Sequence, residues 1–178
     1  MLAGERAKKD PTAEDARAME YLTKTLALTE MRVLSASLAK LPQTIIHPDP
    51  VQINIIATSE TNWTLINWAG AGLGLRAFAL GWVLVTSYMR SGGNIRVVGV
   101  ILKGYHRMKA PGIINEEVDT LGKMAGLRMT NIRAWEVGVG KKAAGDVLKE
   151  VQMWFEARQL VSKRVREVLA KPRAMEDV

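Results

Sequence analysis

The spacing of apolar residues predicts a long helix near the C-terminus. Between residues 142 and 170, apolar residues recur at intervals of three and four, the pattern of a helix that packs along one face. Pro172 follows and ends the predicted helix, because proline lacks the backbone donor that the next turn needs. The apolar face consists of Val147, Val151, Trp154, Val161, Val165 and Val168, with Arg158 in the one remaining position.

A second long helix is predicted from Pro11 to Leu41. Pro11 suits the first helical position, and neither glycine nor proline interrupts the sequence before Pro42. A helix of about 30 residues would be roughly 45 Å long, so we expect part of it to extend from the domain as an N-terminal helical arm. Its second half carries an apolar face formed by Ala27, Met31, Leu34, Leu38 and Leu41.

The segment after this helix is less regular. Residues 42–50 contain three prolines and form a connector that is not helical throughout. Residues 51–57 suit a short strand or an extended segment. Thr58 or Ser59 then caps a predicted helix that runs to about Arg90, and the run 91–94, Ser-Gly-Gly-Asn, ends it.

Glycines at positions 70, 72 and 74 fall inside that predicted helix. They superficially resemble a phosphate-binding loop, but the sixth position of a dinucleotide fingerprint would be Leu75 rather than glycine. We interpret the Gly-Ala alternation as a site of close helix packing.

The segment 95–107 is ambiguous, because its β-branched residues favour a strand. Its cations favour a helix. Arg96, Lys103 and Arg107 are seven and four positions apart, so a helix places all three within about 40° of one another. A strand would place Arg96 on the face opposite the other two. We therefore predict a helix with one basic face.

A further break is predicted at residues 110–112, followed by a helix that Asn115 caps and that ends near Gly126. A short helix over residues 131–137 follows, ended by Gly138 and Gly140. The predicted fold class is therefore all-α: a helical bundle with long N- and C-terminal helices. We expect a single domain over 1–178, divided into an N-terminal helix or arm (1–42), an apolar and basic middle (43–110) and C-terminal helices (111–178).

Charge is concentrated in the middle of the chain. No acidic residue occurs between Glu60 and Glu116, a window of 55 residues that holds six cations and three of the five tryptophans. Residues 87–142 contain ten cations and four acids, whereas 1–42 and 143–178 each contain seven cations and six acids. An excess of positive charge confined to one block indicates a surface for a polyanion.

Sequence-independent binding to a nucleic-acid backbone needs lysine and arginine without nearby carboxylates. The window meets this requirement, and no zinc finger, RNA-recognition signature or helix-turn-helix is present to read bases. The predicted phosphate contacts are Arg76, Arg90, Arg96, Lys103, Arg107 and Lys109, with Lys8, Lys9, Arg17 and Lys24 on the N-terminal arm as a second set. The alternative interpretation of the window is a solvated basic face.

The sequence does not favour an enzyme. There is no cysteine, and the two histidines, His47 and His106, are far apart, so thiolate and histidine-rich metal sites are not expected. No serine, histidine and aspartate arrangement is recognisable. We therefore expect no catalytic residues, no metal and no cofactor, and the charged N-terminal residues do not form a secretory signal.

Residues 65–89 are the strongest membrane candidate, since about 20 apolar residues span a bilayer. Arg76 lies at the centre of this segment, where an arginine costs about 2.5–3.5 kcal/mol on a translocon scale. A helix buried in a protein assembly explains the same residues without that penalty.

The chain resembles the nucleocapsid (major capsid) proteins of filamentous and rod-shaped archaeal viruses. The resemblance is one of architecture and composition, and rests on the helix 11–41, the block 63–109 and the helix 142–170. It implies a helical bundle that wraps double-stranded DNA in the A form within a helical filament. Subunits would pair with themselves or with a related capsid protein.

The expected function is therefore that of a structural, nucleic-acid-packaging protein that polymerises around double-stranded DNA. Such a protein would be assembled in the host cytoplasm and reside in the virion, with or without a membrane envelope. Two alternatives remain: a small membrane-associated helical protein with residues 65–89 inserted, and a basic subunit of a large ribonucleoprotein or enzyme complex. Sequence does not distinguish DNA from RNA.

Overall fold

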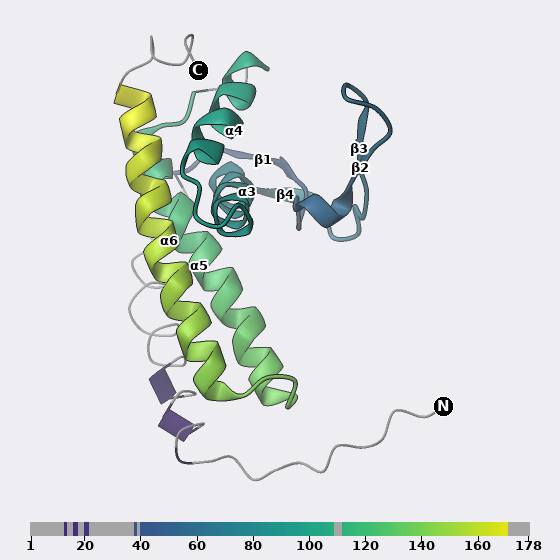
Figure 1. Ribbon diagram of the computed structural model, residues 1–178. Helices are drawn as coiled ribbons and strands as arrows, with labels where there is room; N and C mark the ends of the chain where they lie inside the picture. Colours follow the sequence, from purple (N-terminus) through teal and green to yellow (C-terminus); the bar gives the residue numbers. More distant parts are fainter. Residues whose placement is uncertain are drawn as a thin grey trace.

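The computed structural model describes residues 13, 16, 17, 20, 21, 38, 40–108 and 112–170. In that part of the chain, the longest helices are α5 (Asn115–Gly138) and α6 (Ala144–Ala170). They run antiparallel and side by side over most of their length (Figure 1). A short turn joins them, in which Gly140 has a φ of 70°, a conformation that glycine adopts without steric cost.

Two shorter helices cover the upper half of this pair. α3 (Arg76–Arg90) packs against α5 and α6, and α4 (Arg96–Arg107) packs against α3 and α6. The hydrophobic core lies where the four helices meet. Its fully buried side chains include Leu84, Val85, Val98, Val118, Leu121, Val161 and Val165.

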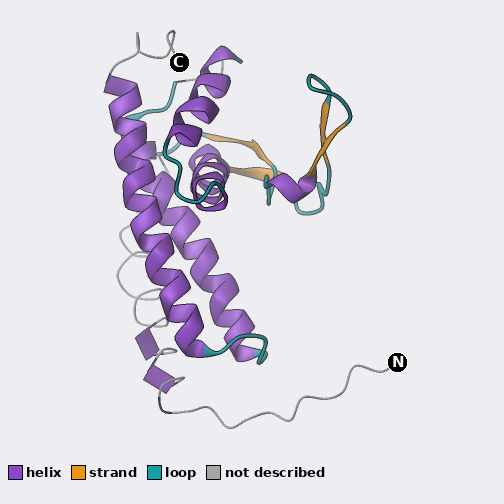
Figure 2. Cartoon of the chain, viewed as in Figure 1, coloured by secondary structure: helices purple, strands orange, loops and turns teal. Residues whose placement is uncertain are grey.

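Four short strands form a projection from the helices. β1 (Gln43–Ile46) pairs antiparallel with β4 (Gly72–Leu75), and β2 (Ile55–Ala57) pairs antiparallel with β3 (Trp63–Leu65). The second pair is nested within the first, so the chain leaves the helices, passes the 3-10 helix η2 (Gln52–Asn54), and returns. Figure 2 shows this interrupted hairpin extending away from the helices. We call residues 43–75 the β-arm.

The base of the β-arm is fixed to the helices through Asp49. Its Oδ1 accepts a hydrogen bond from Trp82 Nε1 at 2.8 Å and lies 3.3 Å from Arg128 Nη2. The Arg128 guanidinium also lies over the Trp82 ring, 4.7 Å from its centroid. His47 is buried, and its Nδ1 accepts a hydrogen bond from the Asp49 amide at 3.0 Å, which leaves Nε2 to donate to the Ile66 carbonyl at 2.8 Å.

Glycine permits the closest helix contact in the core. A Cβ atom on Gly81 of α3 would lie 2.1 Å from the carbonyl oxygen of Leu121 in α5. Real Cβ atoms do not approach an oxygen so closely, so the crossing of α3 and α5 requires glycine at this position.

Several predicted elements are confirmed. The helix predicted over 142–170 is α6, and its apolar residues Val147, Val151, Trp154, Val161 and Val165 are buried. The helix predicted over 95–107 is α4, and the break at 91–94 separates it from α3. The strand or extended segment predicted at 51–57 is confirmed only for β2, because residues 52–54 form the 3-10 helix η2.

The helix predicted to begin at residue 58 is wrong over its first half. Residues 58–75 contain β3 and β4, and helix α3 begins only at Arg76. The glycines at 72 and 74 therefore belong to a strand and not to a helix contact. Pairing with β1 explains the difference, because a Cβ atom on Gly74 would lie 2.5 Å from Ile46 Cδ1 across the ladder.

The predicted helix end at Gly126 is also wrong. α5 continues without a break to Gly138. Gly122 and Gly126 face Arg158 of α6, and a Cβ atom on Gly122 would lie 3.1 Å from the Arg158 carbonyl oxygen. These glycines allow two helices to approach closely, so they do not end one.

The all-α prediction therefore holds for most of the described chain but misses two small antiparallel sheets. The N-terminal helix predicted over 11–41 lies mostly outside the described residues; Arg17, Glu20 and Tyr21 within it are helical. Among the described residues, no helix combines the length and the apolar character of a membrane span. Residues 65–89 do not form a single helix, because they include the end of β3, β4 and most of α3.

Candidate nucleic-acid interface

The basic face predicted for residues 95–107 lies on the outer side of α4. Val98 and Leu102 are buried against the other helices. Arg96 and Arg107 are exposed, and Lys103 is half-buried. The helix therefore buries its apolar side and directs its guanidinium groups to solvent, as the spacing of the cations requires.

The cation at the start of α4 is not explained by the needs of the helix itself. The first turn of a helix favours acidic residues, because free N–H groups make that end positive. α4 has no acid in its first turn and begins with Arg96. His106 and Arg107 suit the negative C-terminal end, whereas Arg96 is electrostatically unfavourable in the isolated protein. An external anion would remove that penalty.

The turn between α3 and α4 extends the basic surface. Arg90 is exposed in the last turn of α3. Gly92 and Gly93 follow with φ values of 68° and 83°, which reverse the chain within a few residues. The Asn94 side chain then accepts a hydrogen bond from the Arg96 amide at 3.1 Å. Five residues separate Arg90 from the start of α4.

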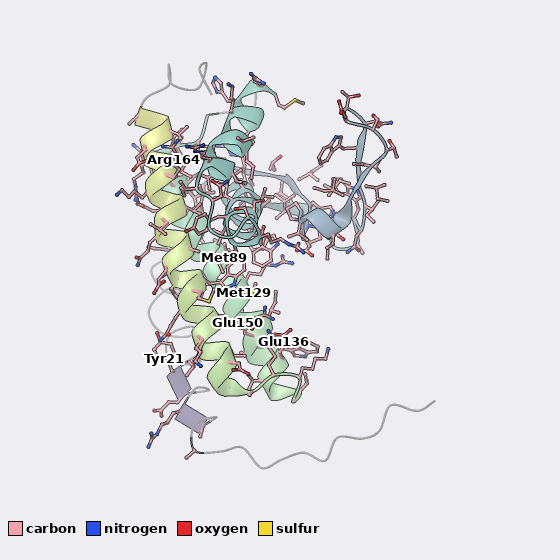
Figure 3. All side chains as sticks on the ribbon, viewed as in Figure 1. Tyr21, Met89, Met129, Glu136, Glu150 and Arg164 are labelled. Carbon is pink, nitrogen blue, oxygen red and sulfur yellow. The ribbon has the colours of Figure 1, made fainter. Side chains whose placement is uncertain are left out.

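The structure adds one cation that sequence reasoning missed. Arg164 of α6 lies beside α4, and its Nη2 is 3.7 Å from the position that a Cβ atom would occupy on Gly99. Figure 3 labels Arg164 on the upper part of α6, on the side next to α4. Its Nη1 is 3.2 Å from Glu167 Oε2, so its charge is partly compensated. Only the packing of α4 on α6 brings it to this surface.

Arg76 was predicted to contact phosphate, but the structure places it in a buried ion pair. Its Nε donates to Glu117 Oε1 at 2.9 Å, and its Nη2 lies 2.5 Å from Glu117 Oε2. The two side chains are 11% and 1% exposed. The hydrogen bond with Glu117 raises the pKa of the Arg76 guanidinium above its ordinary value, although burial acts in the opposite direction.

Glu117 has a second role at the start of α5. Its Oε2 accepts a hydrogen bond from the Ile114 amide at 3.0 Å, in the manner of the glutamate of a capping box. Glu117 therefore stabilises the start of α5. Arg76 and Glu117 together join the start of α3 to the start of α5.

The remaining predicted contacts are dispersed. Arg17 is exposed in a helical stretch near the N-terminus. Lys8, Lys9, Lys24 and Lys109 lie outside the described residues. Arg96, Lys103 and Arg107 thus share α4, Arg164 lies beside α4, and Arg90 ends the preceding helix, whereas Arg76 is buried with Glu117.

Within 40–108 and 112–170, together with the few described residues before them, no cluster of acidic and histidine side chains could hold a metal ion. His47 and His106 are apart, one buried at the base of the β-arm and the other exposed at the end of α4.

Comparison of the chain with models of protein families, with curated proteins and with solved structures found no match.

Proposed function

We propose that this protein is a structural nucleic-acid-binding protein, which binds the phosphate backbone of double-stranded DNA through α4 and polymerises along it. The observation that carries the proposal is the outward basic face of α4 (Arg96, Lys103 and Arg107), on a helix without any carboxylate. The resemblance to nucleocapsid proteins of filamentous archaeal viruses agrees with this role. It would place the protein in a virion.

The dimensions of α4 suit backbone contact. Arg96 and Arg107 are eleven residues apart, which is about 16 Å along a helix. Each DNA strand carries one phosphate per about 3.4 Å of the helix axis, so α4 laid along that axis would span roughly five phosphates of one strand. The face offers arginine and lysine and no amide side chain, so affinity would come from phosphates rather than base edges.

Membrane insertion is the weaker candidate. The segment that would insert is split between strands and α3, and seven of the fifteen residues of α3 are buried in the protein's own core. Burial within the protein already satisfies the apolar character that suggested a bilayer.

A titration of binding against salt concentration tests the proposal. Contacts from Arg90, Arg96, Lys103 and Arg107 predict that log K falls against log salt with a slope of about −4 on duplex DNA. Duplexes of different sequence should give the same slope and similar affinity. A slope near zero would refute the proposal, and a steep slope on RNA but not on DNA would favour the ribonucleoprotein alternative.

A further inference from the structure

The β-arm exposes large apolar side chains on a projection that is only two strands wide. Seven of its large apolar residues are 37–75% exposed, although a two-stranded hairpin is marginally stable in water without further packing. They are Ile45, Ile53, Ile56, Trp63, Ile66, Trp68 and Leu73.

The exposed apolar area of the β-arm is large for a monomer. At roughly 200 Å² for each fully exposed large side chain, the seven residues present on the order of 800 Å², of which Ile53, Ile56 and Trp63 at the outer end contribute about 350 Å². Monomers rarely expose apolar patches larger than about 300–600 Å². The β-arm therefore carries enough apolar surface for a specific protein contact.

A groove lies where the β-arm joins the helices. Its volume is about 960 Å³, and its walls come from β1 of the β-arm, from α3 and α4, and from the start of α5. Apolar wall residues include Ile45, Leu65, Trp68, Ala79, Val83, Ile101 and Ile114. Ile53, Ile56 and Trp63, farther out on the β-arm, do not line it. The outer end of the β-arm is thus separate from the groove, whereas its inner part forms one groove wall.

Charge identifies a second copy of the chain as the partner. The β-arm contains Asp49 and Glu60 and no lysine or arginine. All 25 cations and the other 16 acids lie outside it, so the β-arm has a net charge of −2 and the rest of the chain +9. Asp49 pairs with Arg128, so Glu60 is the charge at the outer end. A projection with one acid and no cation has nothing to bind phosphate or anionic lipid, and suits the net positive body of another copy.

We infer that the outer part of the β-arm of one copy, residues 53–63, docks in the groove of the next copy. The contact is head-to-tail, because projection and groove are different surfaces. Head-to-tail contacts generate rings or open filaments. This inference rests on the proposed function, because the contact would join the subunits of the proposed polymer. The basic face of α4 is not used in the contact and can bind the nucleic acid.

Sedimentation velocity on nuclease-treated protein tests the contact. The wild-type protein should form oligomers that grow between about 1 and 100 µM, the range of weaker standard-size interfaces. Ile56→Ser with Trp63→Ser should raise the dissociation constant at least about 30-fold, as loss of a central apolar anchor does. The matched control, Trp135→Ser with Leu160→Ser, removes a tryptophan and an aliphatic residue of similar exposure from α5 and α6 and should assemble as the wild type does.

A mixing experiment tests the head-to-tail geometry. Ala79→Phe fills the groove and should also give monomers, with Thr44→Trp, at an exposed position of the groove wall, as a second blocking variant if the first does not fold by circular dichroism. Mixed with the β-arm double variant, the blocked protein should form a 1:1 dimer that grows no further, because one intact β-arm meets one intact groove.

Three results would overturn the inference. The first is a monomeric wild type, whether or not it binds neutral lipid vesicles, and the second is a β-arm double variant that assembles like the control. The third is the absence of a dimer on mixing, which would indicate that two β-arms pair symmetrically. The salt titration is independent of these results. A flat salt slope with normal assembly refutes only the proposed function, and a steep slope with no assembly refutes only this inference.

Discussion

The arginine side chains of the basic block lie in different environments. The effect of removing each one depends on its environment. Arg96 and Arg107 point outward from α4 and have no carboxylate on their own helix. Arg76 is enclosed and paired with Glu117. We expect Arg96 and Arg107 to bind an external anion. We expect Arg76 to stabilise the folded protein.

Arg96→Ala with Arg107→Ala should flatten the slope of log K against log salt by about 2, because each phosphate contact contributes about 0.9. Lys141→Ala with Lys149→Ala removes the same charge from exposed positions at the opposite end of the α5–α6 pair and should leave the slope unchanged. If the two pairs had equal effects on the slope, α4 would contribute only through net charge. If neither pair changed the slope, the basic face of α4 would be solvated and would not contact phosphate.

Arg76→Ala should lower the free energy of unfolding by about 3–5 kcal/mol, because it leaves the carboxylate of Glu117 buried without a partner. Urea denaturation measures the change. Arg76→Met with Glu117→Leu removes both charges and should recover most of the loss. A cost below about 1 kcal/mol for the single change would contradict the buried ion pair as described.

At the scale of elements, close contacts fix how the helices cross. Leu121 and Gly122 are consecutive in α5, yet Leu121 meets Gly81 of α3 and Gly122 meets Arg158 of α6. One turn of α5 thus contacts both neighbours. At the lower end, Arg133 Nε lies 2.6 Å from Glu150 Oε2 and joins α5 to α6; Figure 3 labels Glu150 and Glu136 in this region.

Gly81→Ala should destabilise the protein by at least about 2 kcal/mol, since the new methyl group meets the backbone of α5 and backbone atoms cannot move aside cheaply. Gly104→Ala is the control, because nothing lies within 4 Å of its Cβ position, and alanine is favoured over glycine within a helix by up to about 1 kcal/mol. Thermal unfolding followed by circular dichroism measures both. Equal shifts in Tm would refute the close α3–α5 contact.

At the scale of the whole molecule, charge and apolar surface are separated. The helices carry the basic face, and the β-arm carries exposed apolar residues with a net negative charge. A polymer on nucleic acid needs both kinds of contact, one with the polyanion and one between subunits. The mixing experiment tests the molecule at this scale, because its result depends on the β-arm of one copy and the groove of another.

The sequence by itself determined the helices whose residues repeat with a clear period. α6 followed from its apolar face, and α4 followed from the spacing of its three cations, because both patterns are local properties of one helix. Helix boundaries at the Gly-Gly turn and near Gly140 followed from local backbone preferences.

Only the tertiary structure showed the strand pairing of the β-arm, the unbroken helix α5 and the partner of Arg76. β1 and β4 are 26 or more residues apart, so no local pattern reports their pairing. The glycines of β4 and α5 serve contacts with distant segments, and the sequence does not specify which. Arg76 is 41 residues from Glu117; whether an arginine meets a phosphate or a buried carboxylate depends on what packing places beside it.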